Sequence, residues 1–275
     1  MSDAARAQFR DRYGPLAIIA GASEGLGQAL AEELAGRGLD LLLIARNEAR
    51  LGDIAAAIGG RHDVKVRTLP LDLTDADAAP RILAAAEGLE VGLLVYNAGA
   101  VRNADLFLDQ PIELPMRMIK LNCMTPVLLA HALAPAMCER GRGGIVLVGS
   151  TGCFVGAPRI VAYSAAKAFQ VNFVEGLHAE LSPAGVDVLS AVIGSTSTPG
   201  RAREMGVRFD PARDMTPEDV ARQIVGAIGE GPTRVIAKQD SGLGALAGPW
   251  GAFRKSALAV VGAAMKGFAA RTSKG

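Results

Sequence analysis

The sequence predicts an α/β fold: a doubly wound parallel sheet of seven strands with helices on both faces. Two observations predict it. Short apolar runs alternate along the chain with Ala- and Leu-rich segments of helical period, an order that joins parallel strands through crossover helices. Several of the runs are apolar throughout, as in parallel strands that are buried on both faces.

Seven segments are predicted as strands because each is short and mostly apolar. They are Leu16–Ala20, Asp40–Ala45, Val64–Leu69, Val91–Tyr96, Gly144–Gly149, Val186–Ile193 and Arg234–Ala237. The segments between them have the period of helices: Gly25–Arg37, Glu48–Ile58, Asp75–Glu87, Leu114–Arg140, Ala162–Leu181 and Pro217–Ile228. The last of these has a clear start, because Thr216 can cap it and Pro217 suits the first helical position.

The remaining segments set the domain organisation. Residues 194–215 follow the sixth strand and are rich in Thr, Arg and Gly, so they predict an irregular substrate loop or lid. No Pro-, Ser- or Gly-rich linker divides the chain, so residues 1–245 are predicted to form a single domain. Residues 246–275 are predicted as an amphipathic helical extension, with Trp250, Phe253, Ala257, Val261, Met265 and Phe268 at spacings of three or four.

Composition excludes several classes of protein. With 29 basic and 28 acidic residues and no long run of one sign, no nucleic-acid partner is expected. Cys123, Cys138 and Cys153 are odd in number and lack CxxC spacing, so we expect neither disulfides nor zinc, and a cytoplasmic location. The N-terminus is too polar for a signal peptide, and no 18-residue apolar stretch lacks charge, so we expect no membrane span.

The first predicted strand runs into a glycine-rich turn, Gly21-Ala22-Ser23-Glu24-Gly25-Leu26-Gly27, and then into a helix. Glycines let the backbone approach a pyrophosphate, and the helix N-terminus supplies free N–H groups, so the turn predicts a nucleotide site. At the end of the second strand, Ala45 stands where NAD sites place an acid for the ribose 2′-hydroxyl, and Arg46 lies beside it. A guanidinium suits a 2′-phosphate, so we expect NADP(H) in preference to NAD(H), although the acid Glu24 would repel phosphate.

Tyr163 and Lys167 lie four residues apart and therefore share one face of a helix. An ammonium beside a phenol favours the phenolate, so this spacing predicts a tyrosine whose pKa is below its ordinary value of about 10. Such a tyrosine can donate and accept a proton near neutral pH.

Together, these motifs resemble the short-chain dehydrogenase/reductases, in their single-domain branch with a Rossmann-like sheet. The resemblance spans roughly Leu16 to Ala237 and is carried by Gly21-x-x-x-Gly25-x-Gly27, Asp72-Leu73, Asn97-Ala98-Gly99, Asn122, Ser150 and Tyr163-x-x-x-Lys167. The chain departs from the family after the sixth strand, where Ile193-Gly194 replaces Pro-Gly. Gly194 and Thr198 still keep the register of the family's contact with the nicotinamide carboxamide.

The resemblance implies a role for each catalytic residue. Tyr163 is expected to be the acid/base, and Ser150 to hydrogen-bond the same substrate oxygen. Lys167 is expected to lower the tyrosine pKa and to hold the nicotinamide ribose, and Asn122 to keep a water near Lys167. Hydride transfer of this kind needs no metal.

The resemblance also implies the cofactor contacts and the reaction. Asp72 and Leu73 are expected near the adenine, and Asn97 is expected to be structural, with its amide bridging neighbouring strands. The reaction would interconvert an apolar ketone or aldehyde and its alcohol with NADP(H), and apolar residues such as Cys153 and Phe154 favour such a substrate. The family implies a homodimer or homotetramer.

Other functions remain open at this point. The turn also fits the G-x-S-x-G elbow of serine hydrolases with Ser23 as nucleophile, although that leaves Tyr163 and Lys167 without a role. A non-catalytic NADP(H)-binding sensor or scaffold would share the fold, but its expected signature is an incomplete catalytic set. Basic residues flank the C-terminal helix, so peripheral membrane contact is an alternative to docking on the domain or on a partner subunit.

Overall fold

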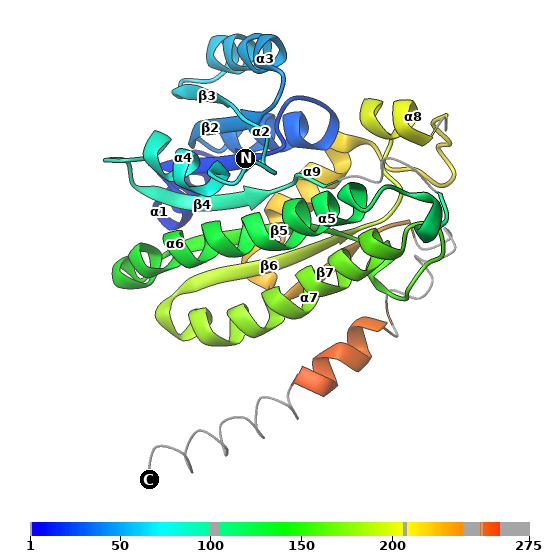
Figure 1. Cartoon of the computed structure of the whole chain (residues 1–275). Helices are drawn as coiled ribbons and strands as arrows, with labels where there is room; N and C mark the ends of the chain where they lie inside the picture. The colour runs from blue at the N-terminus through cyan, green and yellow to red at the C-terminus, as the bar shows by residue number, and fades with distance from the viewer. Residues whose placement is uncertain (1, 100–104, 206–207, 239–247, 249, 259–275) are drawn as a thin grey trace.

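The computed structural model describes residues 2–99, 105–205, 208–238, 248 and 250–258 (Figure 1). Seven parallel strands form one sheet in the order β3-β2-β1-β4-β5-β6-β7. β1 lies inside the sheet, paired with β2 on one side and with β4 on the other. The direction of winding therefore reverses beside β1, and ligands bind at this point in open α/β sheets, beyond the carboxyl ends of the strands.

The strands confirm the predicted fold class. They are β1 Leu16–Ala20, β2 Asp40–Ala45, β3 Val66–Pro70, β4 Val91–Tyr96, β5 Gly143–Ser150, β6 Val186–Ile193 and β7 Thr233–Ile236. Four have the predicted bounds, and the others differ by one or two residues at each end. Every residue of β1 and β4 is buried, because helices cover both faces of the sheet.

Helices and sheet form three layers (Figure 1). One face carries α2 (Gly25–Gly36), α3 (Glu48–Arg61) and α9 (Pro217–Gly226). The other carries α4 (Ala78–Ala85), α6 (Thr125–Arg140) and α7 (Val161–Leu181). Each face buries its own apolar cluster, so the sheet is the shared wall of two cores.

The predicted helix Leu114–Arg140 is continuous but irregular. It consists of α5 (Glu113–Ile119), a π-helical segment η2 (Lys120–Met124) and α6. By length and hydropathy alone the stretch Glu113–Arg140 could cross a membrane. Its buried residues pack instead on the sheet, as one of the domain's covering helices.

A helix at the N-terminus was not predicted. α1 (Asp3–Tyr13) is capped by Ser2, whose hydroxyl oxygen accepts a backbone N–H at 3.3 Å. Its far end is held by Asp187 of β6, which accepts from Arg12 at 2.9 Å and from the hydroxyl of Tyr13 at 2.7 Å. These partners are about 175 residues apart in sequence, so no local pattern could indicate them.

The last two predicted segments of the chain, residues 194–215 and 246–275, each contain a described helix. The predicted irregular segment 194–215 contains a helix, α8 (Pro199–Met205), which corrects that prediction. Residues 250–258 are helical and docked on the domain: the ring of Trp250 lies 4.5 Å from that of Phe154, and Arg254 pairs with the buried Glu175 of α7. Val261, Met265 and Phe268 lie outside the described residues.

Candidate functional site

The glycine-rich turn lies at the carboxyl end of β1. Gly27 packs so closely on the turn that an added Cβ would lie 1.8 Å from the carbonyl oxygen of Gly21. Asn97, directly after β4, donates its side-chain amide to the same carbonyl at 2.9 Å. The amide therefore bridges the neighbouring strands β1 and β4, as expected from the sequence.

The first turn of α2 faces this site without a side-chain cap. Its N-cap residue, Glu24, makes no capping hydrogen bond. The carboxylate instead accepts from Arg50 of α3 at 2.5 Å and from Arg203 of α8. Partial burial opposes ionisation of Glu24, but the two arginines outweigh it and lower the pKa of this carboxyl. A paired carboxylate and uncapped N–H groups fit a bound pyrophosphate. The ion pairs of Glu24 therefore reduce the repulsion of phosphate that was expected from its charge.

Ser23 belongs to the glycine-rich turn, and Arg46 directly follows β2. Arg46 is exposed and forms no ion pair with any described residue, so its guanidinium is available to an anion. Ser23 hydrogen-bonds to none of the three histidines of the chain, all of which are described. His62 bonds to a glutamate, His178 to a strand carbonyl, and His131 is exposed. The serine hydrolase alternative therefore has no base in place.

Asp72 follows β3 and is held by three hydrogen bonds. Its carboxylate accepts from the backbone and the hydroxyl of Thr74 at 2.9 and 2.8 Å, and from Arg117 of α5 at 2.5 Å. Partial burial opposes ionisation, but Arg117 and Thr74 outweigh it and hold the pKa of Asp72 at about 2. Leu73 beside it is buried. The acid expected near the adenine is thus ionised at neutral pH and fixed in position.

Ser150 and Tyr163 meet where β5 ends and α7 begins. Gly152 separates them: a Cβ added there would lie 3.4 Å from the ring of Tyr163 and 3.5 Å from the hydroxyl oxygen of Ser150. The hydroxyl of Ser150 lies close enough to the phenol of Tyr163 to favour a lower pKa of that phenol. Nζ of Lys167 lies 5.7 Å from the centroid of the tyrosine ring. Ser150, Tyr163 and Lys167, three of the four predicted catalytic residues, therefore lie close together.

Lys167 is buried and points toward Gly99. Its Nζ donates to the carbonyl of Val148 at 2.9 Å and to the side chain of Gln170 at 3.0 Å. A Cβ added at Gly99 would lie 3.2 Å from this Nζ and 2.1 Å from Oδ1 of Asn122. Gly99 has a φ of 139°, so both backbone and space require glycine. Oδ1 of Asn122 is buried and has no hydrogen-bond partner among the described residues.

Burial reverses the pKa predicted for the tyrosine. Loss of solvent raises the pKa of Tyr163, and the nearby hydroxyl of Ser150 opposes this only in part. Burial also lowers the pKa of Lys167 to about 8. The ammonium donates to Val148 and Gln170, and loss of solvent is the largest influence on the pKa of the phenol. Tyr163 is therefore a neutral proton donor at neutral pH.

The segment after β6 lies against the glycine-rich turn. Gly194 donates its N–H to Ile236 of β7 at 2.8 Å, and an added Cβ would lie 2.7 Å from Ala237. Thr198 packs on the turn itself: a Cβ added at Gly25 would lie 3.0 Å from the side chain of Thr198. The predicted contact of Thr198 with the nicotinamide stays a prediction.

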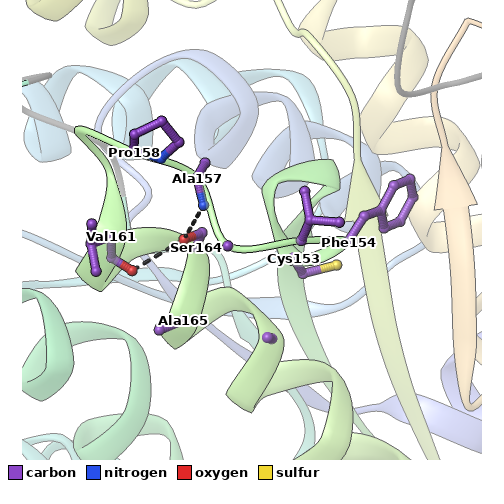
Figure 2. Close-up of a pocket in the computed structure, with 10 residues that line it drawn as sticks. Cys153, Phe154, Ala157, Pro158, Val161, Ser164 and Ala165 are labelled. Atoms are coloured by element: carbon purple, nitrogen blue, oxygen red, sulfur yellow. Dashed lines mark hydrogen bonds between the residues drawn. The ribbon is translucent and has the colours of Figure 1, made fainter.

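A pocket of about 560 Å³ lies on another flank of the first turns of α7 (Figure 2). It is lined by Cys153–Pro158, Val161, Ser164, Ala165 and Ala168. The hydroxyl of Ser164 donates to Val161 at 3.1 Å and accepts from the N–H of Ala157 at 3.2 Å, which ties the loop to the helix. None of the predicted catalytic residues lines this pocket, so it is not where a carbonyl would meet Tyr163. Residues 100–104, which follow the Asn97-Ala98-Gly99 motif, lie outside the described residues.

Three residues of the site were not predicted: Gln170, Arg117 and Arg203. Gln170 follows Lys167 by three residues on the same face of α7, so its polar character at helical spacing was a usable signal. Arg117 and Arg203 bond to residues 45 and 179 positions away, and no local pattern marks such pairs.

The chain is similar to proteins that are already known. Residues 15–205 match the family model described as short chain dehydrogenase. The chain is 34% identical over 222 residues to a 7beta-hydroxysteroid dehydrogenase of Clostridium sardiniense, covering 78% of this chain and 82% of that protein. It is 33% identical over 231 residues to a very-long-chain 3-oxoacyl-CoA reductase of Anas platyrhynchos, covering 82% and 72%. A solved short-chain dehydrogenase from Sphingobium yanoikuyae in complex with NADPH superimposes with a TM-score of 0.75 at 31% identity, covering 81% and 87%.

Proposed function

The chain belongs to the short-chain dehydrogenase family, and from this premise we propose that it interconverts an apolar ketone or aldehyde and its alcohol with NADP(H). It is an oxidoreductase that acts on CH–OH or C=O groups. The observation that carries the finer proposal is the convergence of Ser150, Tyr163 and Lys167, with Asn122 beside Gly99, at the sheet edge that holds the glycine-rich turn.

Each catalytic side chain has a role that its surroundings support. When bound, the nicotinamide supplies or accepts the hydride. Tyr163, neutral at physiological pH, donates a proton to the substrate oxygen, and Ser150 hydrogen-bonds the same oxygen. Lys167 has one N–H that no described residue accepts, and this donor is available to the cofactor ribose. The ammonium also stabilises the phenolate that proton transfer leaves on Tyr163.

NADP(H) is the proposed cofactor because of the charges beside the turn. Arg46 is exposed and forms no ion pair with the rest of the described chain, while the carboxylate of Glu24 is neutralised by Arg50 and Arg203. A 2′-phosphate would meet a free guanidinium and a neutralised acid. The solved relative with bound NADPH supports the same assignment.

The substrate is proposed to be a bulky apolar carbonyl or alcohol. Two relatives are named for a hydroxysteroid and for a very-long-chain 3-oxoacyl-CoA, both of which contain a large apolar group. The loop that follows β5 and the proposed catalytic Ser150 is apolar as well, with Phe154 and Val155 in its sequence. We propose a homo-oligomer in the cytoplasm, since members of the family are typically oligomeric.

The experiment that tests this function compares the wild type with Tyr163→Phe. The variant should keep its affinity for NADPH, because the ring remains, and lose turnover by a factor of about 10²–10⁴, the usual contribution of a general acid. NADPH binding is measured by calorimetry, and its oxidation is followed with a panel of steroid, fatty-acyl and aromatic carbonyls.

Ser164→Ala is the matched control, since it removes a hydroxyl from the same helical turn on the flank away from the site. It should retain most of the turnover. Full activity of Tyr163→Phe would contradict the mechanism, and binding of NADPH without turnover of any carbonyl in the wild type would favour the sensor or scaffold.

A further inference from the structure

Gln170 is a buried amide with both ends bonded. It lies three residues after Lys167 on α7 and is 0% exposed. Its Oε1 accepts from Nζ of Lys167 at 3.0 Å, and its Nε2 donates to the main-chain carbonyl of Asn122 at 2.9 Å. A buried amide costs free energy unless its polar atoms are paired. Here the pairing joins α7 to the π-helical segment η2.

The carbonyl that Gln170 binds is left open by a proline. In α-helical geometry the carbonyl of Asn122 would accept from residue 126, and in π-helical geometry that of Leu121 would accept from the same residue. Residue 126 is Pro126, which has no N–H. Leu121 accepts from the hydroxyl of Tyr96 at 2.7 Å instead, and Asn122 accepts from Gln170. Loss of Gln170 would remove this hydrogen bond from the buried main-chain carbonyl of Asn122.

The same amide orients the ammonium of Lys167. Of its three N–H donors, one bonds to Val148 and one to Gln170. Because Lys167 is 1% exposed, its charge is stabilised by these acceptors in place of water. The third donor is left for the side of Gly99, whose added Cβ would lie 3.2 Å from Nζ.

Lys167 is the group of this cluster that changes charge near neutral pH. The titratable side chains that face it are Tyr163 on α7, Cys123 on η2 and Cys153 after β5. Burial raises the pKa of Tyr163 and of Cys123, and raises that of Cys153 to about 11. Burial lowers the pKa of Lys167 to about 8. A transition near this pH therefore reports the lysine.

We propose that Gln170 is a positioning residue of the acid/base system, one that aims the ammonium of Lys167 at the cofactor ribose and Tyr163 while holding the backbone of Asn122. The inference rests on the proposed function for the roles of Lys167 and Tyr163. From the family resemblance, a water kept by Asn122 was expected near Lys167. The amide of Gln170 makes this connection directly, through two hydrogen bonds from one rigid group.

The test compares wild type, Gln170→Met, Gln170→Glu and Val174→Ala. Gln170→Met removes both hydrogen bonds at similar volume. Gln170→Glu keeps an acceptor for Lys167, adds a negative charge, and loses the donor to Asn122. Val174 is buried one turn further along α7, so Val174→Ala loosens the same helix without touching the lysine. The dissociation constant of NADPH and kcat/KM for NADPH are measured from about pH 6 to about pH 10, a range that spans the transition of the free enzyme.

In the wild type, NADPH affinity and kcat/KM should both fall as pH rises through about 8, where Lys167 loses its proton. Loss of an acceptor disfavours the ammonium, so Gln170→Met should move this midpoint down by about one pH unit and lower kcat by about tenfold. A carboxylate favours the ammonium, so Gln170→Glu should move the midpoint up. Val174→Ala should lower Tm and leave the midpoint in place.

Folded Gln170→Met and Gln170→Glu variants with the wild-type midpoint would overturn the proposal. If Gln170→Met does not fold, the Gln170→Glu variant tests the proposal by itself. Its pH midpoint should move up, whereas loss of an acceptor alone would move the midpoint down. The NADPH dissociation constant needs no turnover, so the two proposals fail separately. A wild type that binds NADPH with this midpoint but reduces no carbonyl contradicts the proposed reaction, whereas Tyr163-dependent turnover with unmoved midpoints contradicts the role of Gln170.

Discussion

At the scale of single residues, pairing decides which charges beside the glycine-rich turn are available to a ligand. Arg50 and Arg203 are both bonded to Glu24. Arg46 is exposed at the end of β2, with no ion pair to any residue in the described ranges. A guanidinium without a protein partner breaks no ion pair when it binds a 2′-phosphate, whereas Arg50 and Arg203 would have to break their ion pairs with Glu24.

Arg46→Asp should therefore reverse the cofactor preference. The change removes a bidentate donor for the 2′-phosphate and supplies an acceptor for the ribose 2′-hydroxyl. We expect NADPH to bind at least about tenfold more weakly, which is about 1.4 kcal/mol, and NADH to bind more tightly. Calorimetric titration with both cofactors checks this. Arg10→Asp, an equal charge change on the exposed face of α1, is the control, and an equal loss in both variants would remove Arg46 from this role.

At the scale of elements, the segment 194–215 is fixed at its base and tied at its tip. Ser195 donates to Asp214, and Thr196 pairs with Met215 in a parallel bridge, which closes the base. The tip, α8, is tied to the turn by the ion pair of Arg203 with Glu24. This ion pair is therefore an exposed latch over the turn where the pyrophosphate is proposed to bind.

Arg203→Ala should loosen this latch and speed cofactor release. Arg203 is 55% exposed, so the pair is worth up to about 1 kcal/mol, and KM for NADPH should rise by up to about fivefold. Stopped-flow release of NADPH measures the effect directly. Arg213→Ala removes a more exposed arginine of the same segment, paired only with Asp210 at 3.8 Å, and should leave release unchanged. Equal rates in the two variants would rule out a latch at Arg203.

At the scale of the whole molecule, one surface is more apolar than a monomer needs. Large apolar side chains are exposed on α5, η2, α6 and α7: Met116, Ile119, Met124, Leu128, Val161 and Phe169. α5 and α7 pack side by side, so these exposed apolar residues lie on elements that contact one another. A second subunit would bury them, as the family's oligomers predict.

Phe169→Glu should shift the protein toward monomers, because it places a charge among these exposed apolar residues. Sedimentation velocity over a range of concentrations measures the change. Phe253 is 71% exposed on the C-terminal helix, away from α5, so Phe253→Glu is the matched control and should keep the wild-type assembly. Wild-type assembly of Phe169→Glu would place the interface elsewhere.

Local patterns made the fold and most of the site predictable. Four strands have the bounds read from their apolar runs, because a strand buried on both faces has few polar residues to blur its ends. The proposed catalytic pair was recognised from its helical spacing together with the other motifs, and the glycine-rich turn from its position after the first strand. Arg117, Arg203 and α1 were not visible, since each is held by a partner far away in sequence.

By itself, the sequence determined which side chains are present at the site and on which element each one lies, because residue spacing and apolar periodicity are local properties. The tertiary structure decided their chemistry. Burial raises the pKa of Tyr163 against the expectation from its neighbour Lys167, and two arginines from distant elements neutralise Glu24. Pro126 cannot donate to the carbonyl of Asn122, and Gln170 from another helix donates to it instead. The solvation and the ion pairs of a side chain depend on which distant residues the fold places around it, and no single segment of the chain carries that information.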